Sequence, residues 1–510
     1  MEKTWRWFGK KDKITLDMLR QIGVEGIVTA LHDVPNGEIW TEEAINDLKT
    51  YIESYGLRWS VVESLPVCEA IKYAGPEREQ LIENYKISLA NLGKCGVKTV
   101  CYNFMPVIDW IRTDLQHPWA DGTSSLYFDR VRFAYFDLRI LQREGAEKDY
   151  SAEELAKVAE LDKTITEAEK DSLVDAIIVK TQGFVNGNIK EGDKNPVNIF
   201  RNLLALYKGI DRDALRENMR YFLAAIMPVC EEYGVNMCVH PDDPPFQVLG
   251  LPRIVTNEED IAWFLNAVDN PHNGLTFCAG SLSAGEHNDT RKLARKFASR
   301  THFVHLRSTA AMPGGNFIES SHLTGRGHLI DLIRIFEKEN PNLPMRVDHG
   351  RMMLGDEDKG YNPGYSFHGL VASYLRYLQM RVKLTNDVKI KQIEQENSEK
   401  LHADRINLFT NFSHELRTPL TLIIAPLEDL LGRADTTASV KKSLELMHNN
   451  AKRLLFLVNQ LMDFRKKEAG KLQIKVAEGN FSLFVEEIVI AFQELANSRH
   501  MTLEYFGKED

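Results

Sequence analysis

The sequence lacks the features of secreted, membrane-spanning and nucleic-acid-binding proteins. Its apolar runs fall short of the ~18–20 residues that an α-helix needs to cross a bilayer, and residues 1–7 contain no apolar core for a secretory signal. The net charge of −10 leaves no surplus of Lys and Arg to neutralise nucleic-acid phosphates. We therefore expect a cytoplasmic protein with no membrane segment and no nucleic-acid partner.

Cysteine is sparse, and its spacing argues against a disulfide framework. The six cysteines form no CxxC pair, and all of them lie before residue 280. Because secreted domains stabilised by disulfides carry closely spaced cysteines, this distribution predicts reduced thiols, as in the cytoplasm. The six are Cys68, Cys95, Cys101, Cys230, Cys238 and Cys278.

The first 350 residues alternate short apolar runs, rich in β-branched residues, with helical patterns. Such alternation gives a parallel sheet, and eight units favour closure into a (β/α)8 barrel. An open doubly wound sheet is the alternative, which we disfavour because no Gly-rich phosphate loop follows the first run. The long connection between residues 106 and 236 predicts a helical insertion or lid. The eight runs are residues 4–8, 27–31, 59–63, 99–104, 236–240, 275–278, 302–306 and 345–348.

After about residue 369 the pattern becomes helical and charged. We expect the barrel domain over residues 1–380, a solvated helical linker over 381–400, a helical hairpin over 401–475 and the start of another domain over 476–510. One apolar stripe on each hairpin helix needs a partner, so we expect a homodimer or larger assembly through a four-helix bundle. The stripes are Phe409, Phe412, Leu416, Leu420, Ile423, Leu427 and Leu430, then Leu444, Met447, Ala451, Leu454, Val458 and Leu461.

Four potential metal ligands end the last four predicted strands: His240, Cys278, His305 and Asp348. Barrel enzymes build their sites at this end from several strands. Two imidazoles, a thiolate and a carboxylate suit a divalent ion such as Mn²⁺, Fe²⁺, Co²⁺ or Zn²⁺. Each residue alone has an ordinary structural explanation, since a buried Cys commonly acts as a small hydrophobe. Their equivalent positions favour a metal site.

The motifs around these residues resemble the mannonate dehydratase family from residue 1 to about 369. The resemblance implies a xylose-isomerase-like barrel, a hydro-lyase, that converts D-mannonate to 2-keto-3-deoxy-D-gluconate and water with Mn²⁺ or Fe²⁺. It also implies the four metal ligands above, with His349 and Tyr365 as catalytic groups. The motifs include Thr-Trp-Arg-Trp-Phe-Gly, Trp-Ser-Val-Val-Glu-Ser, Trp-Ile-Arg-Thr-Asp-Leu, Val-His-Pro-Asp-Asp-Pro-Pro, Phe-Val-His-Leu-Arg-Ser-Thr, Val-Asp-His-Gly and Asn-Pro-Gly-Tyr-Ser.

The residue types suit this reaction, which removes the C2 proton of an aldonic acid and expels the C3 hydroxyl. A neutral imidazole such as His349 is a suitable base, and a phenol such as Tyr365 can protonate departing hydroxide, although the sequence leaves their roles interchangeable. Arg307 and Arg346 are candidate forks for the substrate carboxylate. Structural salt bridges in the barrel mouth are the alternative for both arginines.

The string Asn-Phe-Ser-His-Glu-Leu-Arg-Thr-Pro-Leu-Thr-Leu-Ile, residues 411–423, resembles the phosphoacceptor box of sensor histidine kinases of the hybrid two-component type. The resemblance implies that His414 accepts a phosphoryl group, that Glu415 acts as its acid/base neighbour and that Thr418 serves the reverse reaction. A response-regulator receiver domain would be the partner. Residues 476–510 would begin an ATP-binding domain, whose motifs are absent, so we expect incomplete kinase activity.

Three functional hypotheses follow. In the first, the barrel is an enzyme and the hairpin a dimerising appendage. In the second, the barrel senses a sugar acid and regulates phosphotransfer at His414. In the third, the altered closing helix leaves an unstable and inactive barrel. The complete metal set with His349 and Tyr365 favours the enzyme, because a sensor would not need an acid/base pair.

Overall fold

The computed structural model describes the chain except residues 182–188, 190–191, 433–437, 469–477 and 507–510. The chain divides into two compact units, Met1–Asn386 and Asp387–Asp510. The observed division lies close to the domain boundary that we predicted at residue 380. None of the described helices has the length and hydropathy of a membrane span.

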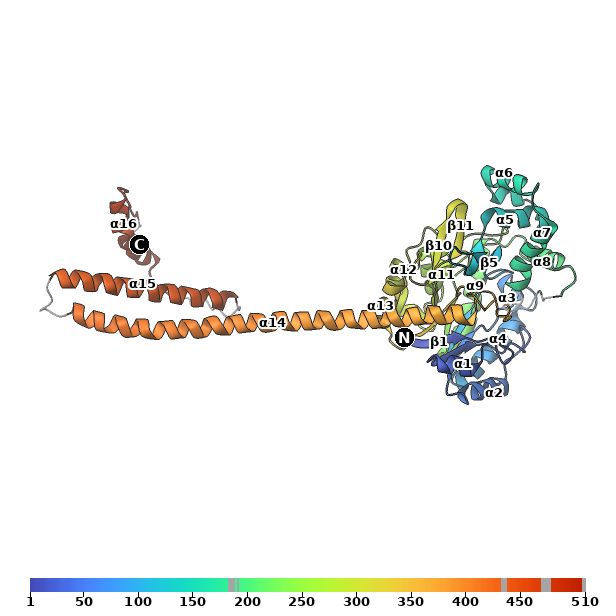
Figure 1. Cartoon of the computed structure of the whole chain (residues 1–510), viewed down its shortest axis with the longest axis horizontal. Coiled ribbons are helices and arrows are strands. Elements are labelled where there is room, and N and C mark those ends of the chain that lie inside the picture. Colours follow the sequence, from blue (N-terminus) through green and yellow to red (C-terminus); the bar gives the residue numbers. More distant parts are fainter. Residues whose placement is uncertain (182–188, 190–191, 433–437, 469–477, 507–510) are drawn as a thin grey trace. The chain divides into compact units, whose positions relative to one another are not determined.

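Eight parallel strands close into a barrel in the order β1-β12-β9-β8-β7-β4-β3-β2 (Figure 1). Each predicted run overlaps one of these strands, so the barrel is confirmed and the open sheet is wrong. Closure is made by β1 and β12, where Thr4 pairs with Arg346. The strands are β1 (Glu2–Arg6), β2 (Gly26–Thr29), β3 (Arg58–Glu63), β4 (Thr99–Tyr102), β7 (Asn236–Val239), β8 (Asn273–Cys278), β9 (Thr301–Leu306) and β12 (Pro344–Val347).

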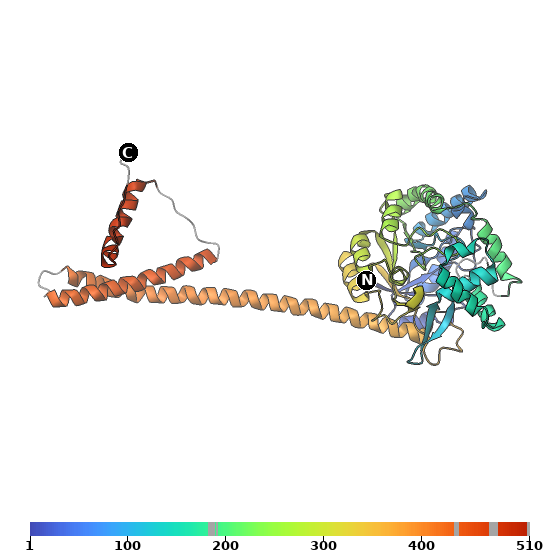
Figure 2. The same cartoon turned by 90° about the horizontal axis from the view of Figure 1, so that it is seen from above.

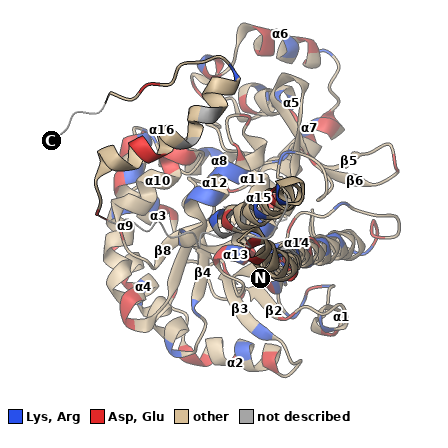
Figure 3. Ribbon diagram, turned by 90° about the vertical axis from the view of Figure 1, so that its left-hand side faces the viewer, with Lys and Arg blue, Asp and Glu red and all other residues tan. Residues whose placement is uncertain are grey.

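Helices surround the barrel (Figure 2), and polar N-caps fix where several of them begin. The Thr41 and Asp211 side chains accept backbone N–H bonds at the starts of α2 and α9. Both acidic and basic residues occur along the outer helices (Figure 3), and Lys94 of α4 pairs with Glu42 of α2 at 2.8 Å. The main helices are α1 (Leu16–Gln21), α2 (Glu42–Glu53), α4 (Arg78–Lys94), α9 (Arg212–Tyr233), α10 (Glu258–Ala267), α12 (Thr290–Phe297) and α13 (Leu329–Glu339).

The insertion after β4 is only partly helical. It contributes α5 (Arg130–Tyr135), α6 (Ala152–Leu161), α7 (Glu167–Val174) and α8 (Pro196–Ala205), which share a second apolar core. It also contributes β5 (Asp114–Pro118) and β6 (Ser124–Phe128). These join β10 (Thr309–Met312) and β11 (Asn316–Glu319) in an antiparallel sheet. The prediction of a helical insertion or lid is therefore incomplete, because the insertion also contributes two strands and β6 pairs with β11, almost 200 residues away in sequence.

The second unit contains α15 (Ala438–Glu468), α16 (Phe481–Ser498) and the later part of α14, which spans Phe367–Leu431. The helix that closes the barrel thus continues without interruption into the predicted linker and hairpin. Of the predicted stripe residues, Leu427 and Ala451 are buried in the hairpin. The predicted Ile423 is exposed and its neighbour Ile424 is buried instead, and Leu416 and Leu454 are also exposed. The Phe409 side chain and the turn from residue 433 lie outside the described residues.

Candidate metal-dependent active site

A polar cavity opens at the carboxyl ends of the barrel strands. It collects side chains from the ends of β1, β3, β7, β9 and β12, as expected for a parallel barrel. Every catalytic and substrate-binding residue that we predicted for the barrel lines it. Among its lining residues are Arg6, Glu63, Asn103, His240, Asp243, Arg307, Arg346, Asp348, His349 and Tyr365.

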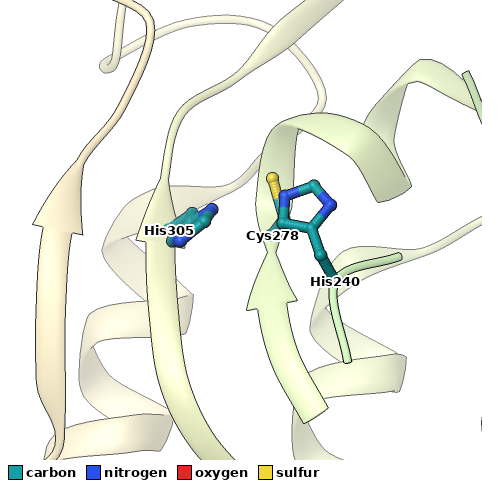
Figure 4. Close-up of side chains that lie close together, drawn as sticks. All are labelled: His240, Cys278 and His305. Atoms are coloured by element: carbon teal, nitrogen blue, oxygen red, sulfur yellow. The ribbon is translucent and has the colours of Figure 1, made fainter. Parts of the chain in front are cut away.

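Three predicted metal ligands meet beside this cavity. His240, Cys278 and His305 each offer one ligand atom, and these atoms all lie within 4.8 Å of one another. Figure 4 shows the two imidazoles on either side of the Cys278 sulfur. Their proximity follows from topology, because β7, β8 and β9 are neighbours and Cys278 pairs in register with His305.

The surroundings of His305 fit a bound cation. This side chain is fully buried, yet neither ring nitrogen has a hydrogen-bonding partner among the described residues. The nearest carboxylate oxygens are Glu63 Oε2 at 3.5 Å from Nε2 and Asp348 Oδ2 at 3.7 Å from Nδ1. An unsatisfied buried polar group is costly, and a metal ion would supply the missing interaction.

The charge state of the thiol also fits a cation. Burial alone would raise the pKa of Cys278, but Arg307 and His240 hold it well below the ordinary value. Burial would likewise lower the pKa of His240, but the Cys278 thiolate raises it to about 10. The Nδ1 atom of His240 contacts the Pro241 carbonyl at 2.8 Å, which leaves Nε2 for the thiolate. A divalent metal can replace the proton that the two groups share.

Asp348, the fourth predicted ligand, lies outside this group of three. Its Oδ1 accepts from Arg346 Nη1 at 2.5 Å and from Tyr365 Oη at 3.0 Å. Its Oδ2 lies 3.2 Å from Arg307 Nε. Burial would raise the pKa of Asp348, but Arg346, His349, His305 and Arg307 together hold it well below its ordinary value.

Arg307 and Arg346, which we predicted as candidates to bind the substrate carboxylate, both form buried ion pairs. Arg346 binds Glu63 through two hydrogen bonds, of 3.1 and 3.0 Å, and also binds Asp348. Arg307 donates to Asp243 and Glu319. A Cβ at Gly280 would lie 2.3 Å from Arg307 Cγ. The absence of a side chain at Gly280 therefore makes room for the Arg307 side chain. The structure therefore contains the salt bridges that we named as the alternative for both arginines.

His349 and Tyr365 lie side by side in the cavity, with ring centroids 5.4 Å apart. The Nδ1 atom of His349 lies 3.2 Å from Glu319 Oε1. Burial would raise the pKa of Glu319, but Arg307 and Arg112 lower it to about 2, so this carboxylate is ionised. This carboxylate can accept a hydrogen bond from Nδ1–H of His349, and in that tautomer Nε2 carries the lone pair. Burial also raises the pKa of Tyr365, which keeps the phenol protonated.

Sequence reasoning missed several residues of this site. Arg112, Asp243 and Glu63 lie inside the quoted motifs. For Glu63, at the end of β3, and Asp243, shortly after β7, a charge close to an apolar strand end was the available signal. Arg112 donates to Asp243 and Glu319 at 2.8 and 2.6 Å. Glu319 had no such signal, because it enters the site from β11 of the small antiparallel sheet.

The predicted phosphoacceptor residues lie on the exposed surface of α14. The side chains of His414, Glu415 and Thr418 are all exposed, and Thr418 Oγ1 donates to the His414 carbonyl at 3.2 Å. Arg417 joins α14 to α15 through a 3.0 Å hydrogen bond to Asn459. An exposed imidazole is accessible to a phosphoryl donor.

Comparisons with known proteins match both units. The D-mannonate dehydratase (UxuA) family model matches residues 1–390, and the His Kinase A (phospho-acceptor) domain model matches residues 404–470. A mannonate dehydratase of Marinomonas sp. (strain MWYL1) is 44% identical over 397 residues, covering 76% of this chain and 100% of the relative. One of Chromohalobacter salexigens is 45% identical over 379 residues, covering 72% and 95%. The solved mannonate dehydratase of Streptococcus suis serotype2 is 34% identical, with a TM-score of 0.58, covering 74% of this chain and 93% of that chain.

Proposed function

The chain belongs to the D-mannonate dehydratase family, and we propose that its barrel converts D-mannonate to 2-keto-3-deoxy-D-gluconate and water with bound Mn²⁺ or Fe²⁺. The observation that carries this proposal is the group of His240, Cys278 and His305 beside the cavity that holds His349 and Tyr365. The six cysteines are free thiols, which suits the reducing cytoplasm.

We assign the cation to His240, Cys278 and His305, with Asp348 as the fourth ligand. When bound, the cation supplies positive charge that stabilises negative charge developing on the substrate. Imidazole and thiolate ligands suit Mn²⁺ or Fe²⁺ better than Mg²⁺, which prefers oxygen ligands.

The geometry favours His349 as the base and Tyr365 as the acid. Glu319 fixes the proton on Nδ1 of His349, so Nε2 takes the C2 proton of the substrate. Tyr365, whose pKa is raised, gives its proton to the C3 hydroxyl, which leaves as water. The electrons of the C2–H bond form the C2–C3 double bond, and the resulting enol tautomerises to the 2-keto acid. The proton on His349 returns the phenol to its starting state.

The metal-loaded chain is expected to form keto acid from D-mannonate but at least ~10²-fold more slowly from D-gluconate, its C2 epimer. The epimer presents its C2 proton on the opposite face, away from a base that Glu319 holds in place. Keto acid formed with each sugar acid, measured at equal concentrations by a colorimetric assay, gives the ratio. Equal rates would contradict the assigned base, and no product from D-mannonate would contradict the proposed function.

The second unit carries a phosphoacceptor domain, and we propose that His414 receives a phosphoryl group and exchanges it with a receiver domain. Its exposed imidazole and the adjacent carboxylate of Glu415 support this assignment, as does the match of residues 404–470. Exposed apolar side chains on both hairpin helices, such as Leu416, Met447 and Leu454, support association of two chains through this unit.

Deletion of residues 387–510 is expected to reduce the number of chains in the assembly while leaving the rate of dehydration within ~2-fold, because the barrel has its own core. An unchanged number of chains would show that the barrel alone determines assembly. Light scattering after gel filtration measures the mass and hence the number of chains.

In the full chain, a separately supplied sensor-kinase ATP-binding domain with labelled ATP should give an acid-labile label on His414. His414→Gln should remove that label and leave the mass unchanged.

A further inference from the structure

Arg6, the last residue of β1, has a donor in the cavity without a hydrogen-bonding partner. Its side chain is 9% exposed and lines the same cavity as His349 and Tyr365. Among the described residues, Nη1 has no hydrogen-bonding partner, and its nearest carboxylate oxygen is Glu63 Oε2 at 3.6 Å. A buried guanidinium with an unsatisfied N–H indicates a missing acceptor.

The other arginines of the cavity do not share this feature. Arg346 makes a two-bond pair with Glu63, and Arg307 donates to Asp243 and Glu319. Each would have to break a buried ion pair before it could bind a substrate. Because Glu63 is already paired by Arg346, it only partly compensates Arg6, so Arg6 is the cation best placed to receive a new anion.

The position of Arg6 is fixed independently of any substrate. Its guanidinium carbon lies 5.1 Å from the Phe8 ring centroid, and Phe8 in turn packs on Tyr365 with centroids 5.1 Å apart. Arg6 is therefore held next to the phenol to which we assign the proton transfer. A substrate group bound by Arg6 would lie close to the reacting carbons.

We propose that Arg6 binds the carboxylate of the aldonate substrate and selects acids over neutral sugars. This inference rests on the proposed function, since it assigns the carboxylate end of that substrate. A planar guanidinium matches a carboxylate in geometry and charge. Placed there, Arg6 also stabilises the negative charge that spreads onto the carboxylate as the C2 proton leaves.

Arg6→Gln is expected to lower kcat/KM for D-mannonate by ~10²-fold, while inhibition by D-mannitol, which has no carboxylate, changes less than ~3-fold. Arg6→Lys keeps the charge but not the fork, so an intermediate loss of ~10-fold is expected. Arg58→Gln is the matched control, because Arg58 is exposed at the start of β3 and pairs with Glu2. Arg58→Gln should leave both kcat/KM for D-mannonate and inhibition by D-mannitol unchanged.

Calorimetric titration of D-mannonate and D-mannitol into each metal-loaded protein separates this inference from the proposed function. Weaker binding of D-mannonate alone in Arg6→Gln supports the carboxylate contact even if no dehydration occurs. Equal weakening of both ligands would assign Arg6 a structural role and overturn the proposal. Unchanged binding and kcat/KM in Arg6→Gln and Arg6→Lys would also overturn it. If Arg6→Gln does not fold, the Arg6→Lys variant alone tests the proposal. An affinity of Arg6→Lys for D-mannonate equal to that of the wild type would overturn it.

Discussion

His349→Asn is expected to lower kcat for dehydration of D-mannonate by ~10²-fold or more while the metal content stays close to stoichiometric. The substitution removes the nitrogen that accepts the C2 proton. It leaves the group of His240, Cys278 and His305 untouched, because His349 contacts Glu319 and Tyr365 instead. Steady-state kinetics together with elemental analysis of the same protein sample measure both quantities.

Tyr365→Phe is the companion variant and should also retain its metal, because Tyr365 is not one of the four proposed ligands and only donates a hydrogen bond to one of them, Asp348. Its kcat should fall for a different reason, namely that departing hydroxide no longer receives a proton. If His349→Asn loses its metal, His349 is a ligand and its assignment as the base is wrong. If both variants retain wild-type kcat, the acid/base assignment is wrong.

The barrel and the group of three potential metal ligands could be predicted because both depend on local patterns. Each strand is a short apolar run, and residues that end neighbouring parallel strands must meet at one end of the barrel. Cys278 and His305 therefore come together with His240 as the sequence predicted. The hairpin could also be predicted from the sequence, because its apolar residues repeat at heptad spacing.

The electrostatic network could not be predicted, because its partners come from distant parts of the chain. Glu319 reaches His349 from β11, whose pairing with β6 joins segments almost 200 residues apart. The sequence left Arg307 and Arg346 open between binding the substrate carboxylate and forming structural salt bridges. It did not show that Glu319, Asp243 and Glu63 would be their partners. Periodicity reports which face of an element is buried, and it does not report which charges meet there.

Removal of the metal is expected to abolish dehydration, because proton abstraction beside a carboxylate needs added positive charge where negative charge develops. The loss should be reversible. Mn²⁺ or Fe²⁺ should restore activity better than Mg²⁺, since two imidazoles and a thiolate disfavour a hard ion. Cys278→Ala should prevent this restoration by removing the thiolate that Arg307 and His240 keep ionised.

The most direct test follows keto acid formed from D-mannonate by the full chain after chelation and dialysis, before and after addition of Mn²⁺. The proposed site predicts no product from the demetallated protein, recovery of the rate with about one Mn²⁺ bound per chain, and no recovery in Cys278→Ala. Full activity of protein shown by elemental analysis to contain no metal would contradict the proposed metal-dependent site.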